Sequence, residues 1–98
     1  MKYETFNEWN DYIFGGTGLQ GYLTATRNEL VSKLGEPTKP EGIIKERWLL
    51  KFEDGTVATI FSDAKTHDNE WCVSSLPTMD KKTKVNIGLT NVYHLFNA

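Results

Sequence analysis

A glycine-rich stretch at residues 15–22 carries the side chains best suited to ligand chemistry. Its four glycines leave the backbone free to turn amides toward an anion. Gln20 can donate and accept hydrogen bonds, and Tyr22 offers an aromatic face with a hydroxyl. No strand is predicted before the stretch and no Gly-Lys-Ser/Thr follows it, so neither common nucleotide fingerprint applies. Two interpretations stay open: an anion-binding loop, or a long turn whose Leu19 and Tyr22 pack on the core.

A metal site could be drawn from Asp63, His67, Asp68 and Cys72. These residue types suit zinc, but their spacing matches no known ligand pairing and falls in a predicted loop. Solvated surface side chains explain the cluster equally well. We therefore expect no metal and no cofactor.

Nucleophilic catalysis would require Cys72 to be activated by His67 or His94. Nothing in the spacing brings these residues together, and a lone cysteine in a strand is usually a small core residue. The thirteen acidic residues always allow some carboxylate pair, but the sequence singles none out. We expect a binding protein and not an enzyme.

The charge balance argues against a general DNA-binding protein. Eleven basic and thirteen acidic side chains give a formal net charge of −2, whereas DNA binders usually carry a basic excess. The lysine cluster at residues 81–84 could meet phosphates, although such a charged loop is more often simply solvated. With one cysteine, no signal-like segment and no long apolar run, we expect no membrane span and a cytoplasmic location.

The length of 98 residues predicts one domain over residues 1–98. The fold class predicted is α+β: a small antiparallel sheet built on an Asp-Gly hairpin at residues 45–62, with flanking helices. A two-residue Asp54-Gly55 loop would favour a type I′ turn and place Phe52 opposite Val57. In that register Leu49 and Ile60 share a second apolar face. That face predicts a homo-oligomer, with a tetramer assembled from dimers as the expected form.

Other elements are predicted from periodicity and capping signals. The spacing of Phe6, Trp9 and Ile13 predicts a short amphipathic helix within residues 1–14. Thr26 and Glu29 form a capping box for a helix that ends at Gly35. Further predicted elements are a strand at 70–76, a charged loop at 77–84, a short strand at 85–87 and a closing helix capped by Thr90.

Several short motifs occur in a fixed order along residues 19–65. They are Leu19-Gln20-Gly21-Tyr22, Glu29-Leu30-Val31, Gly35-Glu36-Pro37, Trp48, and Phe52 to Phe61 around Asp-Gly-Thr-Val-Ala-Thr-Ile, with Lys65 after them. The chain resembles a family of short bacteriophage proteins built on the Leu-Gln-Gly-Tyr and Asp-Gly-Thr-Val-Ala-Thr-Ile motifs. That family is similar to the anti-CBASS sponges, which sequester cyclic dinucleotide signals such as cyclic GMP–AMP as homo-oligomers. The match covers about residues 19–65.

The resemblance implies a viral protein of the host cell cytoplasm that blocks CBASS anti-phage defence without catalysis. Its implied ligand-facing residues are Gln20, Gly21, Tyr22 and Lys65, and Arg47 is a further source of positive charge. Two departures from the family matter. Residues 1–18 form an N-terminal extension before the family-like core at 19–98, and the usual Trp-x-Ile-Gly-Gly reads Val85-Asn86-Ile87-Gly88-Leu89 here. The alternatives are a phage inhibitor that binds a host defence protein directly, and a structural or host-takeover protein without a small ligand.

Overall fold

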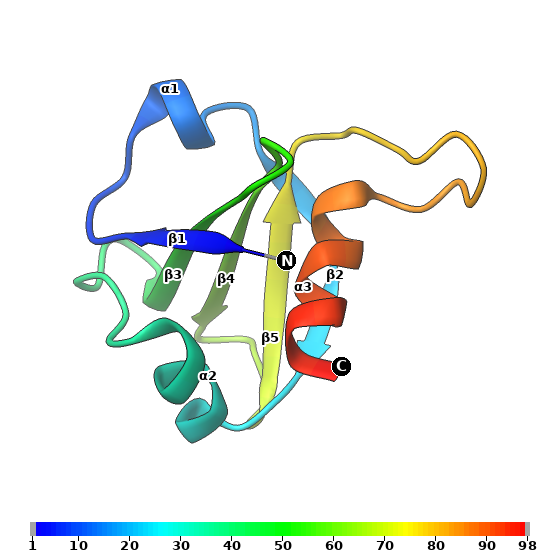
Figure 1. Cartoon of the computed structure of the whole chain (residues 1–98). Coiled ribbons are helices and arrows are strands. Elements are labelled where there is room, and N and C mark those ends of the chain that lie inside the picture. The colour runs from blue at the N-terminus through cyan, green and yellow to red at the C-terminus, as the bar shows by residue number, and fades with distance from the viewer. Residues whose placement is uncertain (1, 98) are drawn as a thin grey trace.

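Five antiparallel strands form one sheet in the order β1-β3-β4-β5-β2, and three helices accompany it (Figure 1). The structure is a computed structural model that describes residues 2–97. The strands are β1 (Tyr3–Phe6), β2 (Gly18–Thr24), β3 (Ile44–Phe52), β4 (Val57–Asp63) and β5 (Glu70–Ser75), and the helices are α1 (Asp11–Phe14), α2 (Arg27–Leu34) and α3 (Ile87–Asn97). The predicted α+β class is confirmed. No helix in the described part of the chain is long and apolar enough to cross a membrane.

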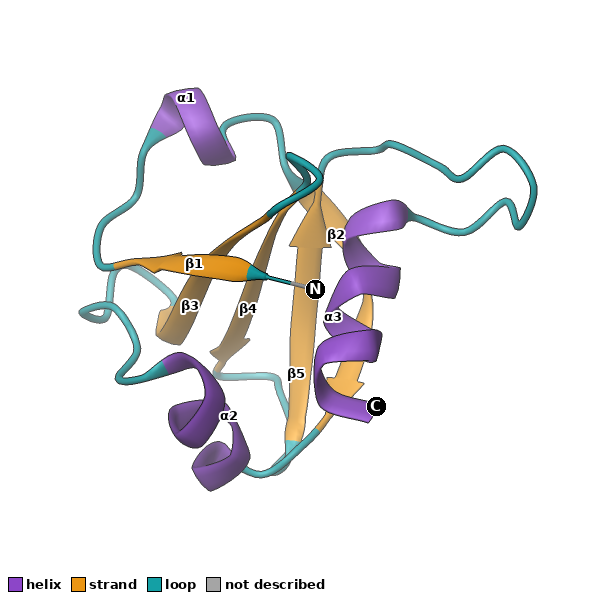
Figure 2. Ribbon diagram, viewed as in Figure 1, coloured by secondary structure: helices purple, strands orange, loops and turns teal. Residues whose placement is uncertain are grey.

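The main core lies between the sheet and the helices α2 and α3, on what we term the helix face (Figure 2). Trp48 and Trp71 meet there edge to face, with ring centroids 5.3 Å apart. The indole Nε1–H of Trp48 donates to the Gly35 carbonyl at 2.8 Å, and that of Trp71 to the Ala25 carbonyl at 2.8 Å. Both buried indoles are therefore paired, so the rings contribute apolar area without an unsatisfied donor.

The opposite side of the sheet, which we term the open face, is only partly covered. Phe14 of α1 is fully buried there against Leu49 and Val57. Leu49 and Leu50 are consecutive in β3 and fall in different cores, as strand alternation requires. The short helix α1 therefore covers one end of this face and leaves the rest to loops and solvent.

Helix α2 forms where its capping signals predict it. The Thr26 hydroxyl accepts a hydrogen bond from the Glu29 amide at 3.1 Å, and Leu30 and Leu34 are buried. Gly35 ends the helix with φ of 82°, which glycine adopts without steric cost.

The β3–β4 hairpin forms, but its predicted register is wrong by one residue. Val57 pairs with Lys51 and not with Phe52. The Phe52 amide donates to the Thr56 carbonyl and the Gly55 amide to the Phe52 carbonyl, so Glu53 joins Asp54 and Gly55 in the loop. Gly55 has φ of 87°, as expected when a type I turn is followed by a left-handed glycine.

The register correction changes which β4 side chains share a face with which β3 side chains. Ile60 pairs with Trp48 and lies on the helix face, whereas Phe61 pairs with Arg47 on the open face. Leu49 and Ile60 therefore lie on opposite faces, and both are fully buried within one chain. The apolar patch that predicted self-association is not present in this form.

The N-terminal predictions are also partly wrong. Residues 3–6 are a strand that pairs with β3, and only Asp11–Phe14 is helical, with Asn10 as its cap. The glycine-rich stretch enters β2, an edge strand paired with β5, with a register shift between Leu19 and Gly21. Pairing with existing strands outweighs both the helical spacing and the glycine content, because tertiary context overrides weak local propensity.

The C-terminal helix begins earlier than predicted. Asn86 caps α3 through a 2.9 Å hydrogen bond from the Leu89 amide, and the Thr90 hydroxyl instead donates to the Asn86 carbonyl. The predicted strand at 85–87 reduces to a single bridge between Met79 and Asn86. The strand predicted at 70–76 is present as β5, and the loop predicted at 77–84 is confirmed.

Candidate functional site

Four side chains form a row across the open face. Arg47 of β3 pairs with Phe61 of β4, Phe61 pairs with Cys72 of β5, and Cys72 pairs with Tyr22 of β2. Directly paired residues in an antiparallel sheet project from the same face. Each of these side chains therefore lies beside the next one across the sheet. A cation thus lies at one end of the row and an exposed aromatic ring at the other.

Arg47 is held in an unusual environment for a guanidinium. Its side chain is only 10% exposed, and its Nη2 forms an ion pair with Glu41 Oε2 at 3.3 Å. The guanidinium lies over the Trp9 ring, 5.0 Å from the centroid, which is a cation–π contact. Its Nε is buried and has no hydrogen-bond partner among residues 2–97. A buried cation with a spare donor favours an additional oxygen acceptor, because its own solvation has been removed.

A hollow of about 190 Å³, which we term the face hollow, lies beside Arg47 on the open face. Its lining consists of Trp9, Thr17, Ile44, Arg47, Thr59, Phe61 and Ser74. No hydrogen bond recorded among residues 2–97 uses the Thr59 or Ser74 hydroxyl, and these two residues are paired partners on β4 and β5. The hollow therefore combines a cation, two free hydroxyls and aromatic walls.

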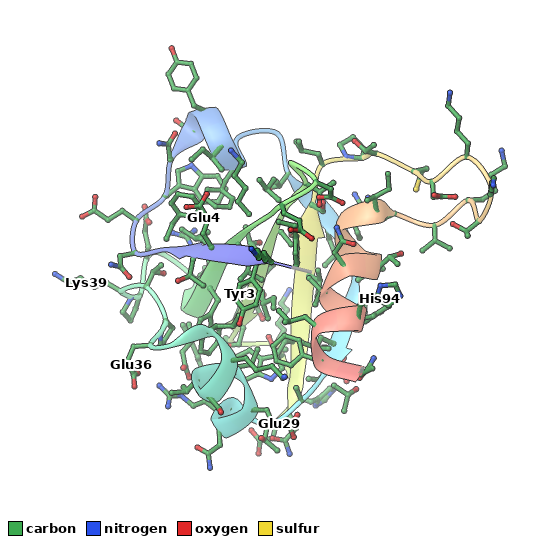
Figure 3. All side chains as sticks on the ribbon, in the orientation of Figure 1. Tyr3, Glu4, Glu29, Glu36, Lys39 and His94 are labelled. Atoms are coloured by element: carbon green, nitrogen blue, oxygen red, sulfur yellow. The ribbon has the colours of Figure 1, made fainter. Side chains whose placement is uncertain are left out.

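A second and larger hollow of about 370 Å³ adjoins the same arginine. We term it the connector pocket, because residues 36–43 between α2 and β3 supply half of its wall. It is lined by Asn7, Glu8, Trp9, Pro37, Thr38, Lys39, Glu41 and Arg47. Glu36 and Lys39 extend from this connector away from the sheet in Figure 3. Arg47 and Trp9 line both hollows, so the two hollows adjoin at this pair of side chains.

Of the residues singled out from the sequence, Tyr22 and Arg47 are brought onto the same face. Tyr22 is 52% exposed at the outer edge of the sheet, and its carbonyl accepts a 2.8 Å hydrogen bond from the Tyr93 hydroxyl of α3. Gln20 is half-buried at the irregularity in β2. Gly21 faces α3, since a Cβ there would lie 2.8 Å from Leu89 Cδ2. Close packing against the helix accounts for this glycine.

The remaining predicted cations lie apart from the row. Lys65 is exposed in the loop between β4 and β5, where its amide donates to Asp63 Oδ1, and no recorded ion pair of the described chain involves its ammonium group. The loop with residues 81–84 projects from the body beyond β5 and is organised by amides that donate to Asp80 Oδ1 (Figure 1). Arg47 is therefore the one predicted cation that the fold places in the row with Tyr22.

The acid–base properties of the site do not suit catalysis by Cys72. Burial raises the pKa of the Cys72 thiol, and the nearby carboxylates of Asp63 and Glu70 raise it further. A thiol with a raised pKa is mostly protonated at neutral pH and is a poor nucleophile. Within residues 2–97, no group of three or more His, Cys, Asp or Glu side chains is arranged to hold a metal ion.

Sequence reasoning missed Trp9, Phe61 and Thr38 as site residues. The spacing of Phe6, Trp9 and Ile13 predicts that Trp9 lies on the apolar stripe of a helix, but the helix begins only at Asp11. The two-residue loop predicts that Phe61 lies opposite Trp48, whereas it pairs with Arg47. The correct register alone would have placed Phe61 opposite Arg47. Thr38 carried no sequence signal, because its role depends on the path of the connector.

No protein-family model, curated protein or solved structure matches this chain.

Proposed function

We propose that this protein is a viral sponge that binds and sequesters a cyclic dinucleotide immune signal in the host cell cytoplasm. In this role it blocks CBASS defence by lowering the free concentration of the signal. The proposal is supported chiefly by one observation: the buried Arg47 and the exposed Tyr22 lie in a single row on the open face. The motif resemblance described above supplies the ligand class.

The row has the chemistry that a nucleotide requires. An aromatic side chain such as Tyr22 can stack on a base, which contributes about 1–3 kcal/mol per base. Arg47 and the Thr59 and Ser74 hydroxyls can donate to phosphate oxygens, and a hydrogen bond with a charged partner contributes about 1.5–3 kcal/mol. Two stacked bases and a few such bonds approach the roughly −12 kcal/mol of nanomolar binding.

The proposed role needs no catalytic group. A Cys72 thiol whose pKa is raised is a poor nucleophile, which fits a site that holds its ligand unchanged. The modest net charge of −2 is compatible with a local cation that serves a small anionic ligand.

The proposal is tested by titrating the purified protein calorimetrically with a panel of cyclic dinucleotides that includes cyclic GMP–AMP. We expect submicromolar binding of at least one member. Heat denaturation of the complex should then release the ligand intact, as judged by mass spectrometry. No binding to any member, or release of a hydrolysed product, would contradict the proposal.

A second candidate function is direct inhibition of a host defence protein. It is favoured by exposed apolar side chains on α1 and in the connector, since Tyr12 is fully exposed and Ile43 is 80% exposed. This role would be favoured over the sponge if a host protein co-purifies in stoichiometric amount and no nucleotide is bound. The substitutions Tyr12→Ser and Ile43→Ser should then release that host protein.

A further inference from the structure

Two buried polar atoms, both in residues that line the connector pocket, have no hydrogen-bond partner within the described part of the chain. They are Arg47 Nε and Thr38 Oγ1, and each residue is only 9% exposed. Buried donors without partners are rare in folded proteins, because each loses its water without compensation. Both atoms can donate, so each could take an additional oxygen partner from a ligand.

The two residues are fixed relative to each other by the backbone. The Thr38 amide donates to the Arg47 carbonyl at 2.8 Å, which attaches the connector to the edge of β3 at this point. On the other side the guanidinium is supported by the Trp9 ring at 5.0 Å. The backbone therefore holds the two residues beside each other, and a ligand oxygen reaches their buried donors when the side chains that now cover them move aside.

The charges around the pocket limit which acceptor fits. Arg47 and Lys39 contribute two positive charges, and Glu8 and Glu41 contribute two negative charges. The Glu41 carboxylate meets Arg47 at 3.3 Å with a side chain that is 74% exposed, a contact that solvent weakens and that an incoming oxyanion can replace. A monoanion can take this place. A dianion is attracted more strongly by Arg47, but it is also repelled more strongly by Glu8 and by the displaced Glu41, which both remain in the lining.

We propose that the connector pocket binds a phosphodiester group, with Arg47 and Thr38 donating to one of its oxygens. Glu41 is an internal competitor for Arg47, and together with Glu8 it selects the singly charged phosphodiester over a doubly charged phosphomonoester. The choice of a phosphodiester over another monoanion rests on the proposed function. The site would thereby favour a cyclic dinucleotide over linear products that end in a phosphomonoester.

The test follows the Arg47 Nε–H and Trp9 indole signals by ¹H–¹⁵N NMR of the full chain. The probes are dimethyl phosphate, methyl phosphate and acetate at a pH of about 8, where the monoester is a dianion because its second pKa is near 6. We expect dimethyl phosphate to shift both signals, and methyl phosphate to bind at least about threefold more weakly because of the added like charge. Equal binding of the two phosphates, equal binding of acetate, or no shift with dimethyl phosphate would overturn the proposal.

Two variants separate this site from a general anion effect. Glu41→Gln should raise the affinity for both dimethyl phosphate and methyl phosphate, and the increase should be larger for methyl phosphate. Unchanged affinities would overturn the role of Glu41. Thr38→Val should weaken dimethyl phosphate without lowering the melting temperature, because valine keeps the shape and removes an unpaired hydroxyl. Unchanged binding by a folded Thr38→Val would overturn the role of Thr38.

Failure of the connector-pocket assignment can be distinguished from failure of the proposed sponge function. If cyclic dinucleotides bind without moving the Arg47 signal, the pocket assignment fails and the proposed function stands. If dimethyl phosphate binds as described but no cyclic dinucleotide does, the proposed function fails and the phosphodiester pocket stands.

Discussion

Tyr22 is the exposed aromatic end of the row on the open face, and its ring makes no recorded hydrogen bond within the described chain. We expect Tyr22→Ala to weaken cyclic dinucleotide binding by about 1–3 kcal/mol, the range for loss of a stacking partner. Calorimetry of the folded variant measures this loss. Tyr12→Ala is the matched control, because Tyr12 is fully exposed on α1 and lies outside the row.

Lys65 provides a second test of which residues contact the ligand. The resemblance places it in the ligand-facing patch, whereas the fold places it in the exposed β4–β5 loop. We expect Lys65→Ala to weaken binding by less than Tyr22→Ala and only at low salt, since an exposed charge acts at long range and is screened. Equal losses in Tyr12→Ala and Tyr22→Ala, or a salt-independent loss in Lys65→Ala, would contradict the row as the binding surface.

Individual residues differ in how far the sequence could place them. Strand alternation places Arg47 on the face opposite its neighbour Trp48, and the structure has Trp48 in the helix-face core and Arg47 paired with Phe61 on the open face. The sequence could not show why position 21 is a glycine, because Leu89 is distant in sequence and contacts Gly21 only when α3 packs on β2. Local pattern determines which face of a strand a residue occupies, but not what packs on that face.

At the scale of elements, Asp54 connects the β3–β4 hairpin to α3. Its Oδ1 accepts from the Thr56 amide at 2.9 Å and hydroxyl at 2.6 Å, and its Oδ2 accepts from Asn91 Nδ2 at 2.9 Å. We expect Asp54→Asn to lower the free energy of unfolding at neutral pH by about 1–2 kcal/mol, because a second amide NH₂ would face that of the buried Asn91. Urea denaturation measures the change.

The same contacts predict a pH dependence. Burial raises the pKa of Asp54, but the hydrogen bonds from Thr56 and Asn91 outweigh it and hold the pKa below its ordinary value. A group with a lowered folded pKa stabilises the fold above its unfolded pKa of about 3.9 and loses that contribution as the pH falls through the folded value. The effect of Asp54→Asn should therefore shrink below a pH of about 4, whereas Asp68→Asn in an exposed loop should change little. If the wild type and Asp54→Asn keep the same difference in free energy of unfolding at every pH below about 4, this account is contradicted.

The packing of α3 on the sheet gives a separate prediction. A Cβ on Gly88 would lie 2.0 Å from Ser75 Oγ and 2.9 Å from the Val57 carbonyl oxygen, and the Ser75 hydroxyl already donates to that carbonyl. We expect Gly88→Ala to destabilise the fold by roughly 2–3 kcal/mol through overpacking. Gly18→Ala is the control, since a Cβ there meets nothing within 4 Å. Thermal melts in which both variants match the wild type would show that α3 shifts without cost.

Elements with complete local signals were predicted well, and elements defined by partners were not. Helix α2 carries its own cap and stop signal, so its bounds follow from residues 26–35 alone. The hairpin register depended on whether Glu53 belongs to the loop or to the strand, and Asp54-Gly55 is compatible with both. The segment at residues 3–6 is a strand because β3 offers it a free edge, which no local pattern reports.

On the scale of the whole molecule, the chain covers one face of its sheet with α2 and α3 and only part of the other with α1. The two edges of the sheet are β1 and β2. Strand β2 leaves Leu19 53% exposed and Tyr22 52% exposed on the open face. Leu49 and Ile60 are buried within the chain and cannot form a contact between copies, whereas the edge strand β2 exposes apolar side chains that can.

We expect the protein to be a homo-oligomer, with dimers joined through β2 and a tetramer assembled from them. An uncapped edge strand offers unpaired backbone groups to a second copy, and antiparallel pairing of two β2 strands satisfies two-fold symmetry. Leu19→Lys should lower the mass measured by light scattering at micromolar concentration, because a charge at the edge opposes pairing. Ile43→Lys is the matched control, since Ile43 is 80% exposed in the connector, away from β2. A wild type that remains an 11.2 kDa monomer, or equal masses for the wild type and Leu19→Lys oligomers, would contradict assembly through this edge.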